Sequence, residues 1–444
     1  MKLSIVVPIG PKDQNFKLFD QLKDKFKDHE IIIACCSQNI NVKKLKEYAN
    51  QSITIQNSTR AKALNAGAKA ASNPLLWFIH LDSDLSLIQP SDLEQINEEK
   101  INTFLLKFDD EKLKLNASGA NFRTKYLGIP FGDQSFIVHK RIFNLLGEFT
   151  ISLNEGEDHE FIWKAKSIGI KVNIIENFVI SSAVKYLPNP TSQTLTTLSK
   201  TILQIIKFRK QRATSVICHF IKDPKSLKSK TRLRKDLTET FVNELNENLI
   251  EIVTDNIIKI KSNKSIHQIV VSERSHKSYA FKFSKITNGL YLTSQEELGK
   301  SMREVIEFNL KYFQKVIIVG SDIPSLTAKD ITDSLNIKSA KNIFYPSVDG
   351  GFCLLLTSDN KILDVIDKIK YGTDNVLEDL TKNLTQLYIN KKFYQDIDVK
   401  EDLPKIYKSL KDNVHSINAS RKKLYTLLYS NQNNLVNNLS SKGS

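Results

Sequence analysis

The chain has 444 residues, 41% of them hydrophobic, and a formal net charge of +15 at pH 7. This length allows about two to four domains with full-sized cores. No run approaches the ~20 apolar residues of a membrane span, and the first residues predict a strand, not a secretory signal. Four cysteines show neither metal-ligand spacing nor a disulfide framework, so we expect a cytoplasmic protein.

The positive charge is concentrated in one segment. Between Lys200 and Lys235 there are twelve basic residues and one acid, Asp223, a net of +11. Such a segment attracts phosphate groups on a nucleotide, a lipid surface or RNA. No nucleic-acid-binding motif accompanies it, so we expect a nucleotide and not a nucleic acid as the partner.

The first half of the chain alternates predicted strands and helices. Apolar runs predict strands at 3–7, 30–34, 53–55 and 75–80, and apolar periodicity predicts helices at 16–26 and 60–71. This order predicts right-handed crossovers and a parallel sheet. A polar and less regular stretch follows and ends near residue 134.

An apolar stripe at helical spacing follows Pro188 and Pro190. The predicted helix is basic and amphipathic, and we expect it to pack on the first domain, with contact to a membrane surface as the alternative. The stripe consists of Leu195, Leu198, Ile202, Ile205 and Ile206.

A second α/β pattern begins at residue 215. Its predicted elements are strands at 215–221, 269–271, 316–319 and 342–345 and helices at about 237–255 and 295–313. We therefore expect a first domain at 1–190, a basic helix or linker at 191–212, a second domain at 213–405, and a helical extension with a polar tail at 406–444.

Two apolar strands, one in each half, run directly into acidic residues. Asp82 follows the strand at 75–80, and Asp322 follows the strand at 316–319. Ligands of open α/β sheets bind beyond the carboxyl ends of such strands, and carboxylates suit Mg²⁺ or Mn²⁺ bound to phosphate. The alternative is that these acids only cap a helix or begin a solvated loop.

Other residues of the first half support a site there. His80, Asp82 and Asp84 alternate, so in extended backbone they project to one side and could hold a metal. Arg60 begins a helix, whose N-terminus favours an anion. The acidic cluster at 155–160 could supply a base to a sugar hydroxyl, or be a solvated loop.

The order and spacing of these pieces resemble the family 2 glycosyltransferases of the GT-A fold. The nearest resemblance is to the transferase group named for arsenosugar biosynthesis and for genes beside radical-SAM and selenium-domain proteins, over roughly residues 1–210. The motifs that carry it are at 4–8, 60–68, 78–83, 128–134, 143–149, 157–161 and 181–186.

The resemblance implies roles for particular residues. Asp82, with His80 and Asp84, would bind the metal, and Asp158, assisted by Glu157, would be the catalytic base. Ala34 stands where such families place an aspartate that holds the nucleotide base. The implied substrate or nucleotide contacts are Pro8, Arg60, Asn65, Asp133 and Gln134.

In the second half, a basic loop at 224–233 could clamp a di- or triphosphate. This half resembles the companion transferase of the same gene neighbourhoods, which has a GT-A or nucleotidyltransferase-like fold and is related to molybdopterin and coenzyme guanylyl- and phospholactate guanylyltransferases. The matching motifs are at 230–233, 320–324, 349–352, 372–377 and 396–399.

This second resemblance implies that Asp322 and Asp398 hold a divalent ion and that Lys230 and Arg232 act on phosphates. Because both strands preceding them open on one sheet edge, we predict that Arg232 and Asp322 border one site. Leu227 replaces a glycine usual in the family. Further implied contacts are Lys222, Thr231, Gly320, Ser321, Asp349, Gly350, Gly351, Thr373 and Asp374.

We therefore predict two tandem α/β domains of the GT-A-like class, that is, Rossmann-like nucleotide-diphospho-sugar transferase domains. The predicted function is bifunctional glycosyl transfer in arsenosugar- or selenosugar-like biosynthesis, with Mg²⁺ or Mn²⁺, a nucleotide sugar or nucleoside triphosphate, and a small-molecule acceptor. The second domain would transfer a sugar or a nucleotidyl group. One alternative is that only the second domain is active, as a nucleotidyltransferase; another is a non-catalytic scaffold that binds nucleotide sugars or a membrane.

Overall fold

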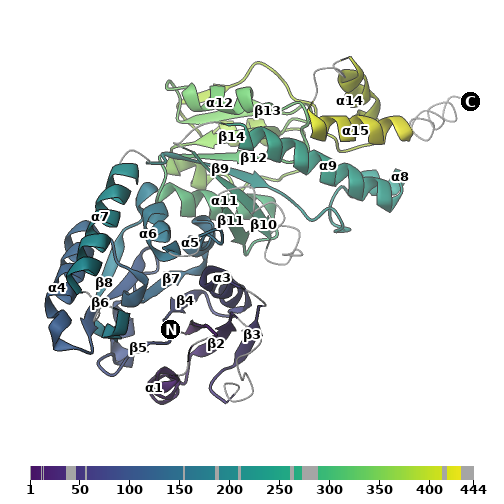
Figure 1. Cartoon of the computed structure of the whole chain (residues 1–444). Helices are drawn as coiled ribbons and strands as arrows, with labels where there is room; N and C mark the ends of the chain where they lie inside the picture. Colours follow the sequence, from purple (N-terminus) through teal and green to yellow (C-terminus); the bar gives the residue numbers. More distant parts are fainter. Residues whose placement is uncertain are drawn as a thin grey trace, which may run out of the picture. The chain divides into compact units, whose positions relative to one another are not determined.

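The chain divides into two compact units, Met1–Arg212 and Ala213–Ser444. Each is an α/β unit (Figure 1). The computed structural model describes residues 2–11, 13, 15–36, 47–55, 58–153, 156–185, 190–208, 212–260, 265–272, 289–412 and 418–431.

The first unit is built on an eight-stranded sheet with the order β3-β2-β1-β4-β7-β6-β8-β5. Strands β3, β2, β1 and β4 are parallel, whereas β7 is antiparallel to both β4 and β6. The strands are β1 (Leu3–Ile9), β2 (Glu30–Cys35), β3 (Gln51–Thr54), β4 (Leu75–Phe78), β5 (Ser83–Asp84), β6 (Ile101–Phe108), β7 (Phe136–His139) and β8 (Val172–Ser181).

The four strands predicted from the first apolar runs are parallel, as expected, and the sheet as a whole is mixed because β7 is reversed. The stretch expected to be irregular contains β6, whose first six residues are all buried, and the reversed strand β7. Polar residues flank these strands, so their apolar runs are short and weak as sequence signals. The reversal matters for function, because β7 begins at the edge where β4 ends: Phe136 is paired with Phe78.

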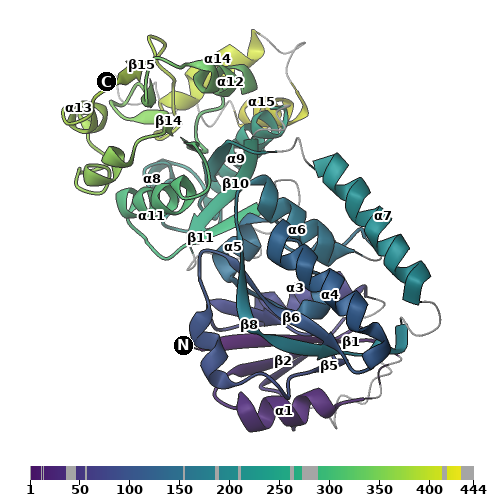
Figure 2. The same cartoon turned by 90° about the vertical axis from the view of Figure 1, so that its left-hand side faces the viewer.

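Helices cover both faces of this sheet (Figure 2). Alternate residues of β1 point to opposite faces. A β-carbon added at Gly67 of α3 would lie 2.4 Å from Val6 Cγ1, so the glycine lets α3 approach the sheet closely. The helices are α1 (Lys17–Lys25), α3 (Arg60–Ala70), α4 (Lys114–Phe122), α5 (Lys140–Leu145), α6 (Glu157–Ser167) and α7 (Pro190–Phe208), with a π-helical turn η3 at Arg123–Leu127.

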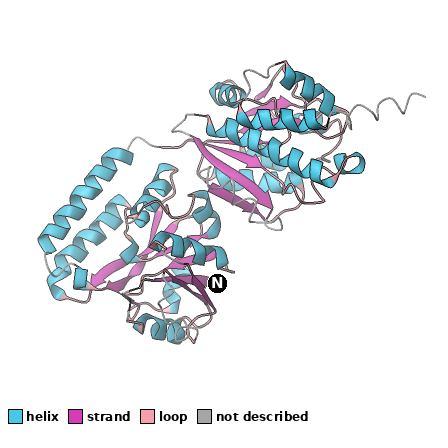
Figure 3. Ribbon diagram, turned by 45° about the vertical axis from the view of Figure 1, so that its right-hand side comes forward, coloured by secondary structure: helices cyan, strands magenta, loops and turns pink. Residues whose placement is uncertain are grey.

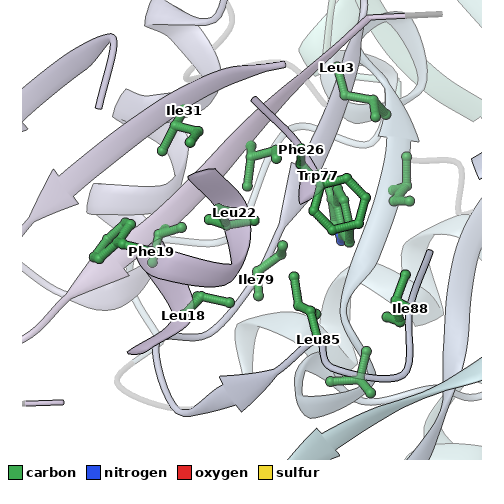
Figure 4. Packing of buried hydrophobic residues seen from close by; sticks show 14 of the residues in the cluster. Leu3, Leu18, Phe19, Leu22, Phe26, Ile31, Trp77, Ile79, Leu85 and Ile88 are labelled. Carbon is green, nitrogen blue, oxygen red and sulfur yellow. The ribbon is translucent and has the colours of Figure 1, made fainter. Parts of the chain in front are cut away.

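The core beneath α1 forms from the apolar stripe that predicts this helix. Phe19, Leu22 and Phe26 are buried against β1, β2 and β4 (Figure 4). The ring of Phe26 meets Trp77 edge-on at 5.1 Å. Burying such a side chain contributes about 1.5–3 kcal/mol to the stability of the fold. This packing therefore stabilises the sheet that carries the first site.

The second unit repeats this topology. Its seven-stranded sheet has the order β11-β10-β9-β12-β14-β13-β15, again with four parallel strands followed by a reversed strand, β14. Two tandem α/β domains of the GT-A-like, Rossmann-like class are therefore confirmed. The strands are β9 (Ser215–Phe220), β10 (Ser265–Ser272), β11 (Gly289–Thr293), β12 (Lys315–Val319), β13 (Asn342–Pro346), β14 (Phe352–Thr357) and β15 (Leu387–Ile389).

Helices again cover both faces of the second sheet (Figure 3). Ile217 packs with α9 and α12 on one face, and the neighbouring Cys218 meets Asn309 of α11 on the other. The helices are α8 (Leu233–Asp236), α9 (Glu239–Ile258), α11 (Leu298–Leu310), α12 (Ala328–Asn336), α13 (Val376–Thr381), α14 (Asp402–Lys411) and α15 (Ala419–Ser430).

The last two helices belong to the core of the second unit. Leu403 of α14 and Leu424 and Leu428 of α15 are fully buried with Leu245 and Leu249 of α9. Within the described part of the chain, no helix is long and apolar enough to cross a membrane.

Candidate active sites

The first site lies where β4 ends, β7 begins and the helices α3 and α6 start. Arg60, the first residue of α3, donates from Nε to Oε1 of Glu157, the first residue of α6, at 2.5 Å. The Glu157 side chain is 2% exposed and that of Arg60 36% exposed. This ion pair ties the two helix N-termini together, and both ends favour an anion.

Asp158 follows in α6 and is held by the turn before β7. The backbone N–H of Gly132 donates to Oδ2 of Asp158 at 2.7 Å, and His159 Nε2 lies 4.0 Å from the same oxygen. Although burial alone would raise the pKa of Asp158, His159, Arg60 and the Gly132 N–H together hold this pKa below its usual value. Asp158 is therefore a carboxylate already well supplied with positive partners.

Gly132 itself lies between the two predicted functional groups. A β-carbon added there would be 2.8 Å from Asp158 Oδ2 and 3.0 Å from His80 Cε1. Any larger residue would push one of these side chains away. The structure thus brings His80 and Asp158 together around a position that only glycine can fill without a shift.

Asp133, next in the chain, is in the opposite electrostatic state. Its Oδ1 atom is buried and has no hydrogen-bond partner among the described residues. Burial, together with the charges of Asp158 and Asp82, raises its pKa to about 6 against the attraction of Arg123. A buried oxygen without a hydrogen-bond partner costs free energy. A proton, a cation or a hydrogen-bond donor from a ligand at Asp133 Oδ1 would remove this cost.

A stack of three side chains supports this site from behind. Arg123 lies 3.4 Å from the ring of Phe131, which stacks on His159 with the ring centroids 3.5 Å apart. Arg123 also donates from Nε to the Ile129 carbonyl at 2.8 Å. The sequence reasoning missed Arg123 and this stack; the one available signal was a cation shortly before the glycine-rich turn.

Other predicted residues of the first unit make structural contacts. Asn65 bonds both backbone groups of Phe149, at 2.8 and 3.1 Å. Gln134 is fully buried, accepts from the Thr124 hydroxyl and donates to a backbone carbonyl. Asp84 accepts from the side chain of Gln21 and from a backbone N–H.

The remaining predicted residues of this unit are Pro8 and Asp82. Pro8 is buried in β1 and paired with Ala34 of β2, so the edge lacks the aspartate usual in the resembling families. Asp82 is exposed, and its charge raises the pKa of both Arg60 and Asp133. Its metal-binding role stays a prediction.

The second site lies at the same edge of the second sheet, around Lys230. Its ammonium bonds Asp322 Oδ2 at 3.1 Å, Asp398 Oδ1 at 2.9 Å and the Ile397 carbonyl at 2.6 Å. The Lys230 side chain is 8% exposed. Burial lowers the lysine pKa, but the two carboxylates outweigh burial and raise it, so this lysine is a fixed positive charge.

Lys230 also has an unusual backbone. Its φ of +50° is in the left-handed region, which costs a residue with a side chain of order 1 kcal/mol or more. The three contacts of the ammonium supply a reason for retaining this conformation. Strain held by charged contacts is characteristic of functional sites, although it does not by itself identify the function.

The turn that carries Asp398 is held from both sides. The Ile397 N–H donates to the Asp322 carbonyl at 3.2 Å, which joins this turn to the end of β12. Asp402, near the start of α14, accepts from the N–H groups of Asp398 and Val399. The sequence did not indicate a special role for Asp402, because an aspartate at the start of a helix is common as a cap.

The structure brings Arg232 to the same cluster. Its NH1 atom lies 3.8 Å from Asp398 Oδ2, and its side chain is 57% exposed, so it can still turn toward a ligand. Burial raises the pKa of Asp322, but the Lys230 charge outweighs this and holds it below its usual value. Arg232 and Asp322 are thus linked through Lys230 and Asp398, although 90 residues separate them in the chain.

A group of three carboxylates adjoins this ion pair. Ligand oxygens of Asp349, Asp396 and Asp398 all lie within 4.8 Å of one another. Asp396 is 7% exposed. Its burial raises its pKa to about 7, and the charges of Asp349, Asp322 and Asp398 contribute to this rise. These carboxylates repel one another, and a divalent cation would relieve that repulsion.

The carboxylate group forms because the turn before β14 is tight. Gly350 has a φ of +83°, and a β-carbon there would lie 1.9 Å from the Asp374 carbonyl oxygen. Asp349 Oδ1 accepts from the N–H of Gly351 at 3.1 Å and from the hydroxyl of Ser347. Glycine is therefore required at 350, where any side chain would strain the turn and collide with the backbone.

The other predicted residues of this unit are at or near the turns. Lys222 is exposed, and its charge helps to lower the pKa of Asp322. A β-carbon at Gly320 would lie 3.2 Å from Asp322 Oδ1. Thr373 donates to the Lys370 carbonyl. Ser321 is half-buried, and Thr231 and Asp374 are exposed.

Across the described ranges, the carboxylates of Asp349, Asp396 and Asp398 are the single group of three or more acidic, histidine or cysteine ligands that come this close. His80, Asp82 and Asp84 do not reach that proximity. Asp396 was not among the predicted metal ligands, although it belongs to the motif at 396–399. The predicted pair Asp322 and Asp398 is bridged by Lys230 instead.

The fold defines the chain as a tandem of GT-A-like α/β domains. Residues 257–373 match a family model described as "Uncharacterized protein conserved in bacteria (DUF2064)". This match covers less than half of the chain and includes Asp322 and Asp349, whereas Lys230 and Asp398 lie outside it. No curated protein matches the sequence.

Several solved structures are similar to parts of the chain. A protein classed as a nucleotide-diphospho-sugar transferase from Desulfovibrio desulfuricans G20 is 21% identical, with a TM-score of 0.44 over 50% of this chain and 97% of its own. A cytidylyltransferase from Leptospira borgpetersenii serovar Hardjo-bovis (strain JB197) is 13% identical, with a TM-score of 0.32 over 51% of this chain and 98% of its own.

The mannosyltransferase PcManGT from Pyrobaculum calidifontis, solved in complex with GDP-Man and Mn²⁺, is 12% identical. Its TM-score is 0.31, over 40% of this chain and 56% of its own. Because all three scores are below 0.5, the assignment of a function depends on the residues of the two sites.

Proposed function

We propose that the chain is a transferase for nucleotide-activated substrates and that its second unit holds a divalent metal and a nucleotide. The observation that carries this proposal is the proximity of Asp349, Asp396 and Asp398, within 4.8 Å, beside the buried Lys230. Oxygen ligands in this number suit Mg²⁺ or Mn²⁺, which keep further positions for water and phosphate.

The residues of the second unit divide the work. Asp349, Asp396 and Asp398 would hold the ion, which when bound neutralises charge on phosphate oxygens. Lys230 keeps two acidic turns together and presents a fixed positive charge beside them. Arg232 is mobile enough to bind phosphate oxygens in pairs, which suits its planar group. Together these residues would orient a nucleotide and stabilise charge that develops during transfer.

The reaction of the second unit is nucleotidyl or sugar transfer. The resemblance of the motifs in this unit to guanylyltransferase-related enzymes supports nucleotidyl transfer, and their resemblance to a transferase family of GT-A fold supports sugar transfer. We retain the proposal that the chain is bifunctional and belongs to the synthesis of a modified sugar of the arsenosugar or selenosugar type. Activity of the second unit alone, as a nucleotidyltransferase, is the competing proposal; the absence of a base-binding aspartate at Ala34 favours it.

For the first unit we propose sugar transfer to an acceptor hydroxyl. The resemblance names Asp158 as the base, but its lowered pKa makes it a weak one. Asp133 has a pKa near 6 and an oxygen without a partner among the described residues, which are the properties of a base that works near neutral pH. We therefore propose Asp133 as a second candidate base, with Asp158 orienting the turn beside it.

Incubation of the full chain with a panel of nucleoside triphosphates and nucleotide sugars, with and without Mn²⁺, tests the proposal. Release of pyrophosphate from a triphosphate identifies nucleotidyl transfer, and release of a nucleoside diphosphate from a nucleotide sugar identifies sugar transfer. Variants Asp396→Asn and Asp133→Asn then assign each activity to a unit. If no nucleotide is bound or consumed with either metal, the proposal is wrong.

A further inference from the structure

Helix α7 of the first unit turns polar residues toward the unit and leaves most of its large apolar residues exposed. Two of its polar residues meet the unit: Thr201 is 5% exposed, and the Gln204 side chain accepts from Trp163 Nε1 at 2.9 Å. Most of its large apolar residues face outward, whereas Ile205 of the predicted stripe is half-buried. The exposed stripe, called here the α7 stripe, consists of Leu195, Leu198, Ile202, Leu203 and Ile206.

Four of the five residues of the predicted stripe, all but Ile205, are exposed, so the expectation that the stripe packs on the first domain is wrong for most of it. Leu195 and Ile206 are both 67% exposed, and Leu198 is 54% exposed. The stripe spans three turns of one helix face, so it is not a set of scattered single exposures, which would need no explanation. Leaving several large aliphatic side chains in water forgoes about 1.5–3 kcal/mol for each.

The charge around the stripe indicates what covers it. From Pro190 to Arg212 the sequence carries five basic residues and no acid. A helix with this composition and one apolar face is typical of segments that lie in the interface of an anionic membrane. A protein partner with an apolar groove would have no need of so uniform a charge.

A second exposed apolar patch lies on α4 and the turn that follows it. Leu115 is 85% exposed and Tyr126 is 72% exposed, and the ring of Phe122 packs on Tyr126 at 4.6 Å. Lys125 stands between these aromatic residues in the chain. Aromatic rings next to cations are favoured at the membrane–water boundary. Figures 1 and 2 both show α4 and α7 as neighbours in the first unit.

We infer that the α7 stripe, with the α4 patch beside it, seats the first unit on an anionic lipid surface. The apolar side chains would enter the boundary between headgroups and acyl chains, and the basic residues would face the lipid phosphates. No helix in the described residues spans a bilayer, so this contact is peripheral and reversible.

Vesicle flotation with the full chain tests this inference. We expect binding to phosphatidylcholine vesicles that contain phosphatidylglycerol, much weaker binding to phosphatidylcholine alone, and release by salt. The double variant Leu198→Glu/Ile202→Glu should lower the partition coefficient about tenfold or more. The matched control Leu87→Glu/Ile258→Glu makes the same charge change at exposed apolar positions elsewhere and should bind as the native chain does.

Three results would overturn the inference. The first is an absence of binding to the anionic vesicles, and the second is equal loss of binding in the control variant. The third is a native dimer in light scattering that the Leu198→Glu/Ile202→Glu variant converts to a monomer without any vesicle binding, which would identify the stripe as an interface between copies. Unchanged circular dichroism of both variants confirms that folding is not the cause.

Discussion

The two units have the same strand topology but balance the charges at their sites differently. In the first unit, cationic groups surround the acids: Arg60 bonds Glu157, and His159 and Arg60 act on Asp158. In the second unit, Asp322 and Asp398 bond one buried ammonium, that of Lys230, and the carboxylates of Asp349 and Asp396 lie within 4.8 Å of Asp398.

Acids stand at equivalent positions of the two sheets. Asp82 follows β4 as Asp322 follows β12, and Asp133 precedes the reversed strand β7 as Asp349 precedes β14. The difference therefore arises from the surrounding residues, not from the sheet. The excess of acids at this edge of the second unit suits the divalent cation proposed there, whereas in the first unit Arg60 and His159 already offset the charges of Glu157 and Asp158.

The largest expected effect is on activity of the second unit. Asp398→Ala removes both a proposed metal ligand and a partner of Lys230, and should lower metal-dependent nucleotide turnover about 100- to 1000-fold, the effect of losing about 3–4 kcal/mol of charge stabilisation. Asp364→Ala, at an exposed acid in the same unit, is the control. Turnover within a few-fold of native in the Asp398 variant would remove Asp398 from the site.

The next largest effect is on the free energy of unfolding of the second unit, where Asp396 lies among other carboxylates. Asp396 has a pKa raised to about 7, so its favourable contribution is present below about pH 4 and is lost as the pH rises through 7. Without metal, Asp396→Asn should stabilise the second unit at pH 8 by roughly 2–4 kcal/mol. Hydrogen exchange of β12 and β14 measures this change.

The same titration predicts the behaviour of metal binding. Because the ion must displace the proton of Asp396, Mn²⁺ affinity of the native chain should rise as the pH increases through about 7. Isothermal titration at pH 6 and pH 8 detects this. A pH-independent affinity would show that Asp396 is not a ligand.

The ion-paired cation of each site, Lys230 or Arg60, can also be removed. Lys230→Met leaves Asp322 and Asp398 without their partner, and because both are about one-third exposed we expect a loss of roughly 2 kcal/mol. Added Mn²⁺ should restore part of this loss. Arg60→Met should also destabilise the first unit, but without rescue by Mn²⁺. Equal rescue in both variants would contradict the difference proposed between the sites.

The smallest effects are expected from the two acids of the first site, and they should have opposite signs. The pKa of Asp133 is raised to about 6, so its contribution declines as the pH rises through 6, and Asp133→Asn should stabilise the unit at pH 8 by roughly 1–2 kcal/mol. The pKa of Asp158 is lowered, so its contribution is present at pH 8 and Asp158→Asn should destabilise. Hydrogen exchange of β4 and β7 distinguishes the two outcomes.

The alternation of strands and helices can be predicted from the sequence, because its signal is the periodicity of apolar residues. The stripe of Phe19, Leu22 and Phe26 predicts α1, and the apolar runs predict β4 and β12, because burial demands the same side chains whatever surrounds them. The acidic strand ends were visible too, since a polar residue directly after a buried strand must emerge at its edge. Two tandem GT-A-like domains could therefore be predicted.

Tertiary structure alone decided which of these groups meet and in what charge state. That Lys230 bridges Asp322 and Asp398 depends on contacts across 92 and 168 residues, and spacing along a chain does not specify such pairs. The raised pKa of Asp396 needs burial and three neighbouring carboxylates together. The outward direction of the α7 stripe was likewise undetermined by periodicity, which shows that a helix has an apolar face but not what that face touches.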